Sequence, residues 1–177
     1  MESSARRTWL WDALWLVVWG VASSAWCLSA AGQLSATFDE PVYLSLGLQR
    51  WRSGSTAGLM KLGTMPLPVD VQTLPLYLWE RWHGTPIDLV ADFHKVLPWA
   101  RAATLLFWWL LLVHAWLAGR WLGGPWAGAL AVAFLACEPC LAAHAALATT
   151  DIAVAACLLA LAYHFRVHRE GGGASRR

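Results

Sequence analysis

Charged side chains are scarce in this sequence. Only 14% of its 177 residues are Asp, Glu, Lys or Arg, whereas 58% are hydrophobic. A soluble domain carries about a quarter charged residues, so this chain has too little polar surface for that class. The formal net charge is only +2. The chain therefore lacks the excess of basic residues that would indicate a nucleic-acid partner.

Cysteine is also scarce, and its placement argues against a disulfide framework. Cys27, Cys137, Cys140 and Cys157 all lie in or beside apolar runs. Cys137-Glu-Pro-Cys140 has C-x-x-C spacing, but the second pair that would complete a zinc site is missing. We expect four small thiols buried in membrane segments.

Tryptophan is abundant instead. Many of the 14 Trp residues sit near the ends of apolar runs, where indole rings favour the membrane interface. Residues 9–31 follow Arg6 and Arg7 and are long enough to span a bilayer, which needs roughly 20 residues. A signal peptide is the alternative, but its apolar core is usually roughly 7–15 residues. We therefore interpret residues 9–31 as an uncleaved anchor.

Further apolar runs predict an all-α integral membrane protein with about four transmembrane helices. The later runs cover 102–118, 126–143 and 151–165, with a turn at 119–125 and a break at Glu138-Pro139. The predicted organisation is a cytoplasmic N-terminus (1–8), a first span (9–31), a long outward loop (32–99), three spans (100–165) and a disordered cytoplasmic tail (166–177).

The arginines predict an orientation. Seven arginines fall on alternate connections: Arg6, Arg7, Arg120, Arg166, Arg169, Arg176 and Arg177. By the positive-inside rule both termini face the cytoplasm. We expect a multi-pass protein of the cytoplasmic membrane whose long loop faces outward.

The loop at 32–99 holds most of the prolines and much of the charge. Loops of this length usually carry function. We expect two short amphipathic helices in it, at 42–51 and 74–82, lying on the membrane surface. Gly63-Thr-Met-Pro-Leu-Pro68 predicts a rigid extended turn between them.

Asp39 and Glu40 begin the first of these helices. Thr37 and Glu40 have the spacing of a capping box, Asp39 is an equally good N-cap, and Pro41 fits the first turn. The two carboxylates would then lie at the lipid boundary. Capping alone is the competing interpretation.

A second candidate region runs from Glu138 through His144 to Asp151. Ionisable residues at the end of a membrane helix are functional candidates. The competing interpretations are that Asp151 caps the last helix and that His144 is a hydrogen-bonded interior group. The predicted orientation places both acidic regions on the outer side. Two acids at one cavity could hold a divalent metal, although no pattern requires one.

These features together resemble the GT-C membrane glycosyltransferases. The resemblance rests on the anchor, on Asp39-Glu40 ahead of an amphipathic helix, and on Pro139-x-x-x-x-His144-x-x-x-x-x-Thr150-Asp151. It covers about residues 9–165 and is greatest to the bacterial branch of aminoarabinose lipid transferases, related to protein mannosyltransferases. Such enzymes pass a sugar from a polyprenyl-phosphate carrier to a lipid, glycan or protein acceptor outside the membrane.

The resemblance implies roles for individual residues. Asp39 matches the catalytic base, Glu40 stands beside it, and Asp151 matches an acid near the same cavity. Arg101, His144 and Tyr43 are the implied substrate contacts. Pro66-Leu-Pro68 occupies the place of a His-Pro-Pro-like motif, but no histidine precedes it. No cofactor is required.

The residue types suit direct, inverting transfer, because a carboxylate can accept the acceptor's proton and Arg can stabilise a departing phosphate. The chain is shorter than such enzymes generally are. The alternatives are therefore an N-terminal module completed by a second chain, and a catalytically silent fragment or assembly subunit. A small transporter or channel component is a third, weakened by the lack of charge in mid-span.

Overall fold

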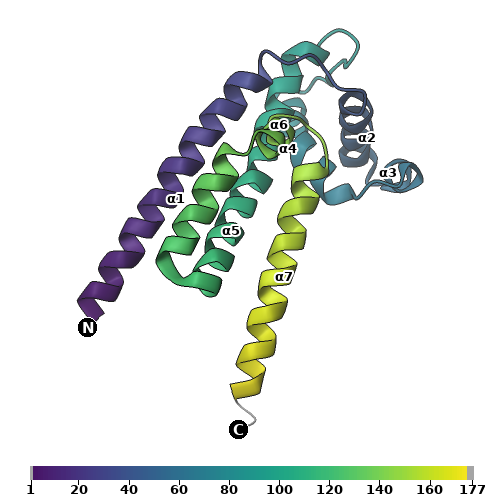
Figure 1. Cartoon of the computed structure of the whole chain (residues 1–177). Coiled ribbons are helices and arrows are strands. Elements are labelled where there is room, and N and C mark those ends of the chain that lie inside the picture. The colour runs from purple at the N-terminus through teal and green to yellow at the C-terminus, as the bar shows by residue number, and fades with distance from the viewer. Residues whose placement is uncertain (1, 175–177) are drawn as a thin grey trace.

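The computed structural model describes residues 2–174, with side chains from 9 to 170. Every regular element within them is helical: α1 (Glu2–Ala31), α2 (Glu40–Ser53), α3 (Ala57–Leu62), α4 (Pro66–His83), α5 (Phe93–Cys137), α6 (Pro139–Ala145) and α7 (Asp151–Ala174). The long helices α1, α5 and α7 form the bundle, with α5 in contact with both others (Figure 1). The start of α1 and the end of α7 lie at one end, here called the terminal end; α2 and α4 lie toward the opposite, distal end.

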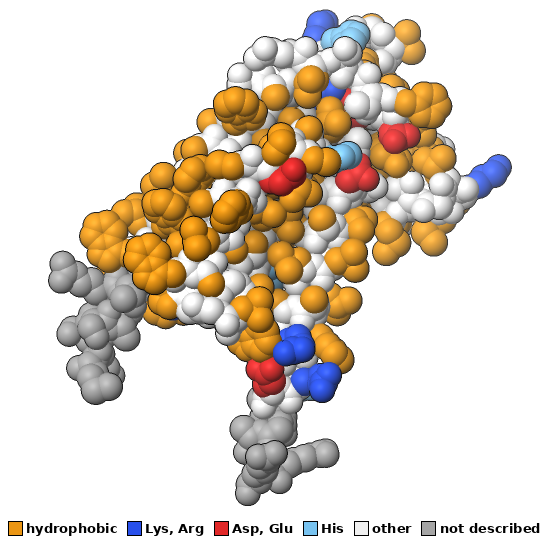
Figure 2. All heavy atoms as spheres, viewed as in Figure 1, with side chains coloured by type: hydrophobic (Ala, Val, Ile, Leu, Met, Phe, Trp, Pro, Cys, Tyr) orange, Lys and Arg blue, Asp and Glu red, His pale blue; other side chains and the backbone are white. Residues whose placement is uncertain are grey.

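Three segments are long and apolar enough to cross a membrane: Trp9–Ala31, Phe93–Cys137 and Asp151–Glu170. Large apolar side chains such as Trp26, Phe134 and Leu161 point away from the bundle and are exposed, and hydrophobic groups cover much of the surface in Figure 2. Lipid accommodates such a surface, whereas water does not. The helical fold and these spans together indicate a membrane protein, as predicted.

Helix α5 reverses direction within its length. Gly123 and Gly124 leave the helical conformation, and Gly124 has φ 78° and ψ −166°, a region open essentially to glycine. The chain turns back there, giving arms at 93–122 and 125–137 (Figure 1). The arms touch closely, since a Cβ on Gly119 would lie 2.7 Å from the Ala127 carbonyl oxygen.

The second arm is short. Residues 125–137 rise only about 20 Å, less than the hydrocarbon thickness of roughly 30 Å. The predicted apolar run over 126–143 is divided between two helices, because α5 ends at Cys137 and α6 starts at Pro139. The predicted break at Glu138-Pro139 is confirmed, and the Glu138 carboxylate accepts a hydrogen bond from the Leu141 N–H at 2.6 Å.

Two other expectations are corrected. The prolines of Pro66-Leu-Pro68 begin α4 instead of extending a turn, because the first helical turn does not need their missing N–H groups. The chain turns just before them, at Gly63 with φ 76°. The predicted disorder of 166–177 is wrong for 166–174, where α7 continues; residues 175–177 lie outside the described part.

The segment between α1 and α5 is a packed helical unit. Helix α2 covers the predicted 42–51, and α4 covers 74–82 with two additional turns before it. Leu44 and Leu48 of α2 pack with Leu76 of α4 and Leu97 of α5 in a core of their own. A second core fills the bundle around Trp108. The distal helices therefore rest on the beginning of α5 as a rigid platform.

Candidate functional site

Arg101 and Glu40 form an ion pair at the centre of the distal end. Arg101 Nε and Nη2 lie 2.7 Å from Glu40 Oε1 and Oε2, respectively. The two side chains are only 1% and 0% exposed. Two parallel bonds of this kind are the strongest geometry that a guanidinium and a carboxylate can adopt.

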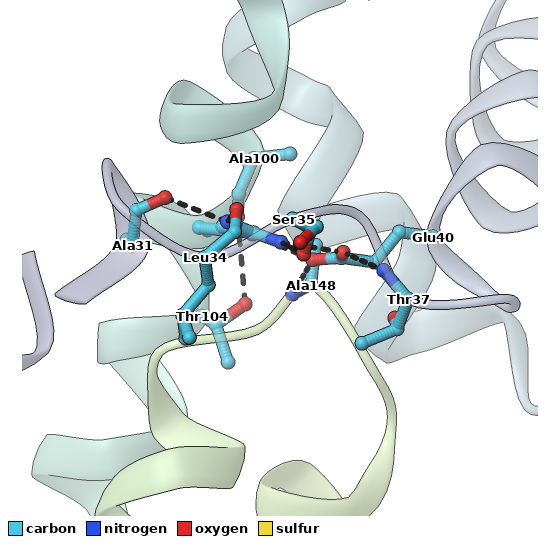
Figure 3. A network of polar contacts seen from close by, with 9 residues as sticks. Ala31, Leu34, Ser35, Thr37, Glu40, Ala100, Thr104 and Ala148 are labelled. Carbon is cyan, nitrogen blue, oxygen red and sulfur yellow. Dashed lines mark hydrogen bonds and ion pairs between the residues drawn. The ribbon is translucent and has the colours of Figure 1, made fainter. Parts of the chain in front are cut away.

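The remaining Arg101 donors bind backbone oxygens. Nη1 donates to the carbonyls of Ala31 (2.6 Å) and Leu34 (2.9 Å), and Nη2 donates to that of Ser35 (2.9 Å) (Figure 3). A guanidinium has five N–H groups, so all five are used. Its positive charge also lies against the C-terminal end of α1, where the helix dipole favours a cation.

The Glu40 carboxylate is equally occupied. Oε2 also accepts the Thr37 N–H at 2.9 Å, which is one half of the predicted capping box, and Oε1 accepts the Ala148 N–H at 2.8 Å (Figure 3). Burial alone would raise the pKa of Glu40. The hydrogen bonds from Arg101, Ala148 and Thr37 outweigh burial and hold that pKa below its ordinary value.

We call this network of Arg101, Glu40 and their backbone partners the clamp. It joins the end of α1, the start of α2, the first arm of α5 and the segment between α6 and α7. Glu40 and Arg101 have no accessible lone pair or N–H left for a substrate in this arrangement. In this arrangement the two side chains hold other parts of the chain in place, and the direct roles that the family resemblance implies for them stay predictions.

Asp39 differs from its neighbour. It occupies the N-cap position of α2, but its side chain makes no capping hydrogen bond, and it is exposed. The capping interpretation therefore does not account for this carboxylate. Tyr43 follows one helical turn later and is partly buried; its N–H donates to the Asp39 carbonyl at 2.9 Å. Residues four apart lie on the same face of a helix, so the side chains of Asp39 and Tyr43 are neighbours at the start of α2.

Asp151 and His144 also meet. Asp151 Oδ2 lies 3.1 Å from His144 Nδ1 and accepts a hydrogen bond from Thr149 Oγ1 at 2.9 Å. Both side chains are partly exposed. Asp151 is the first residue of α7, so a structural role at the helix start and a chemical role remain compatible.

The clamp connects these two groups. Asp39 precedes Glu40, and Ala148 lies between His144 and Asp151, so the bond from Ala148 to Glu40 fixes one acidic segment against the other. Acidic and histidine side chains lie near one another toward the distal end in Figure 2. Two of the predicted residues, Glu40 and Arg101, form the buried clamp. The other four lie on the segments that the clamp joins: Asp39, Tyr43, His144 and Asp151.

Among the polar contacts that sequence reasoning missed are one beside the candidate site and one within the bundle. Gln72 of α4 donates to the Thr149 carbonyl at 2.7 Å, next to Asp151. Nε2 of His114 and Nε2 of His164 lie 3.3 Å apart between α5 and α7. The signal for the second pair was present, since histidines are uncommon inside apolar spans.

The described residues contain no group of three His, Cys, Asp or Glu side chains that could hold a metal. The cysteines are free; Cys27 is buried within the protein, whereas Cys137, Cys140 and Cys157 are exposed on its surface, and their burial in the membrane stays a prediction. Comparisons with protein-family models, curated proteins and solved structures found no match. The arguments for function are therefore the geometry of the site and the sequence resemblance.

Proposed function

We propose that the chain is a membrane glycosyltransferase, or the N-terminal module of one. It transfers a sugar from a polyprenyl-phosphate carrier to an acceptor on the outer side of the cytoplasmic membrane. Both termini face the cytoplasm and the distal end faces outward. The second arm of α5 together with α6 makes the third of four crossings, and α7 makes the fourth. The distal helices α2 and α4 lie at the outer membrane surface.

One observation carries the proposal. The carboxylate of Asp39 is exposed and makes no capping hydrogen bond, while the clamp beside it is buried and fully hydrogen-bonded. A general base must reach a substrate proton and be held in place. Asp39 is accessible, and its neighbour Glu40 is fixed by four hydrogen bonds. This combination favours a positioned base over a capping residue.

The reaction follows from that placement. Asp39 accepts the proton of the acceptor hydroxyl as its oxygen attacks the anomeric carbon. The bond from that carbon to the phosphate oxygen breaks, and the electron pair leaves with the phosphate of the carrier. Attack opposite to the leaving group inverts the anomeric centre. The proton ends on Asp39, and the imidazole of His144, oriented by Asp151, contacts the phosphate or the acceptor.

An apolar groove of about 520 Å³ is an argument that the donor is linked to a lipid. It lies between α1 and the junction of α5 with α6, and is lined by Trp19, Trp26, Ala30, Ala142 and other apolar side chains, with Ser23. It extends along α1 toward Leu34, whose carbonyl binds Arg101. An isoprenoid chain in this groove would bring its phosphate toward the distal end.

A catalytically silent assembly subunit is the second candidate. The observation in its favour is that Glu40 and Arg101 are wholly engaged in internal hydrogen bonds. Such a subunit would keep the clamp but transfer no sugar. Activity of the chain, alone or with a partner that completes it, separates the two candidates.

The test compares Asp39→Asn with Asp88→Asn, an exposed acid elsewhere in the distal unit. Transfer from a radiolabelled polyprenyl-phosphate sugar should fall about 100-fold or more in Asp39→Asn, the usual scale for a general base, and stay unchanged in the control. Both variants should insert and fold normally, because each replaces an exposed side chain by an amide of the same size. Full activity in Asp39→Asn would end the assignment of the base. No donor binding by the unmutated chain would favour the silent subunit.

A further inference from the structure

A second cavity, of about 320 Å³, lies at the distal end between α4, the following loop and the start of α5. It is lined by the aliphatic side chains of Leu76, Ile87 and Val96 and by the indoles of Trp79 and Trp99, and both tryptophans are exposed. Asp92 and Lys95 complete the lining. Its volume is at the lower end of the range for small-molecule sites, about 300–1,000 Å³.

The clamp indicates the depth of this cavity relative to the membrane. Arg101 Nη1 binds the carbonyl of Ala31, the last residue of α1, so Arg101 is level with the end of the first span. Residues 92–99 precede Arg101 along α5 and extend beyond that level by about 3–13 Å at the usual helical rise. The cavity therefore lies in the headgroup and water region, beyond the hydrocarbon.

The polar side chains of the cavity form a neutral pair. Lys95 Nζ donates to Asp92 Oδ1 at 2.7 Å, and both groups reach solvent. The second carboxylate oxygen and the remaining ammonium N–H groups can accept and donate further hydrogen bonds. A charged ligand would have to compete with this pair, whereas a neutral polar ligand would not.

Apolar rings beside a neutral hydrogen-bonding pair match the chemistry of a pyranose. A sugar ring has a face of C–H groups, which packs on the flat, electron-rich face of an indole. Its edge carries hydroxyl groups that donate to a carboxylate and accept from an ammonium. An acyl chain would use the indoles but leave Asp92 and Lys95 without a role.

We infer that this cavity is a binding site for a neutral sugar ring. Trp99 and Arg101 are two residues apart, so their side chains point about 200° apart around α5, and the cavity lies on the other side of the helix from the clamp. The bound ring is therefore not the one that reacts at Asp39. Resting on the proposed function, this identifies the acceptor as a glycan, one ring of which is held between Trp79 and Trp99.

The test measures saccharide binding without transfer. The full chain is placed in phospholipid nanodiscs free of sugar-based detergent, because a maltoside headgroup would compete for the site. Neutral trisaccharides of glucose, N-acetylglucosamine or mannose are added, and binding is followed by saturation-transfer NMR. Trp99→Ala and Trp79→Ala should weaken binding at least ten-fold, and Asp92→Asn should weaken it several-fold.

Trp82→Ala is the matched control. Trp82 also belongs to α4 and is 87% exposed, but it does not line the cavity; its replacement should leave binding unchanged. Absence of saccharide binding by the unmutated chain, or an equal loss in Trp82→Ala, would overturn the inference. Trp79 and Trp99 would then be interfacial anchors only.

The result is separable from the proposed reaction. Asp39→Asn should bind the trisaccharide as the unmutated chain does. Saccharide binding without any transfer would refute the proposed reaction but support the assignment of the cavity. Transfer to a glycan at an unchanged rate in Trp99→Ala would refute the assignment of the cavity but support the reaction.

Discussion

The guanidinium of Arg101 and the carboxylate of Glu40 meet through two 2.7 Å contacts, although 61 residues separate them in the chain. Five backbone groups complete the network, three carbonyls around Arg101 and two N–H groups around Glu40. Such a pair fixes the relative positions of the segments that it joins, but it adds little net stability, because desolvation offsets much of the attraction. Removing only one partner, in contrast, is strongly destabilising.

Arg101→Met should destabilise the fold by about 3–5 kcal/mol, because it leaves the Glu40 carboxylate buried without its counter-ion. Arg101→Lys should also destabilise it, since an ammonium cannot reproduce five donors in a planar fork. The double variant Glu40→Gln/Arg101→Met should recover part of the loss. Chemical unfolding in mixed micelles measures all three.

The control for this series is Arg166→Met. Arg166 pairs with Glu170, and both side chains are more than half exposed, so the loss of Arg166 should cost at most about 1 kcal/mol. Equal costs at Arg166 and Arg101 would show that the clamp is not a special support of the distal end.

Glu40 and Asp70 should respond to pH with opposite signs. The lowered pKa of Glu40 means that its stabilisation is present above the unfolded value of about 4.3 and is lost as pH falls through the lower folded value. Burial raises the pKa of Asp70, against the smaller effect of Arg50. Charged Asp70 therefore reduces stability at pH 7, a penalty that sets in as pH rises from about 3.9 through its raised folded value.

We therefore expect Asp70→Asn to be more stable than the parent at pH 7 and equal to it below about pH 3.9. Glu40→Gln should show the reverse, with its deficit largest at neutral pH. Unfolding midpoints between pH 3 and pH 8 provide the measurement. A stability loss at pH 7 in Asp70→Asn would mean that its contact with Arg50, 3.7 Å away, outweighs burial.

Gly119→Ala should disrupt the turn of α5 on itself. The added Cβ would lie 2.7 Å from the Ala127 oxygen and 2.9 Å from the Gly128 Cα, and backbone atoms cannot move aside as a side-chain tip can. We expect a loss of about 1–3 kcal/mol, typical of overpacking. Gly32→Ala is the control, because its nearest neighbour would be 3.9 Å away. Similar thermal stabilities of the two variants would contradict the close contact.

The proposed orientation can be tested with two single cysteines in a cysteine-free background. Ser55→Cys lies between α2 and α3, and His168→Cys lies near the end of α7; both positions are exposed. A membrane-impermeant maleimide added to intact cells should label the first and spare the second. Labelling of position 168 alone would place Asp39 and Asp151 on the cytoplasmic side.

The sequence predicted those features that depend on local signals. Glu138-Pro139 breaks a helix because Pro139 cannot continue it, and this break is where the structure has it. Pro66 and Pro68 were ambiguous, because the same residues suit an extended turn and the first turn of a helix. Local sequence favours neither, and the packing of α4 on α2 and α5 decides.

The clamp could not be predicted, because neither Glu40 nor Arg101 identifies its partner by spacing. Asp39 and Glu40 look equivalent in sequence, yet one is exposed and the other fully buried. Their different fates depend on the approach of α5 and of the segment at Ala148. The sequence therefore indicated the segments that the clamp joins, while the division between buried and accessible groups required the fold.

The separation of Glu40 from Arg101 also constrains how the protein is made. A ribosome adding about 5–20 residues per second delivers Arg101 roughly 3–12 s after Glu40, and Ala148 is 108 residues behind Glu40. During that interval the carboxylate has no counter-ion and must stay hydrated. Glu40 can therefore be buried in its final place only after Arg101 and Ala148 have been synthesised, so the packing of α2 on α5 is completed late.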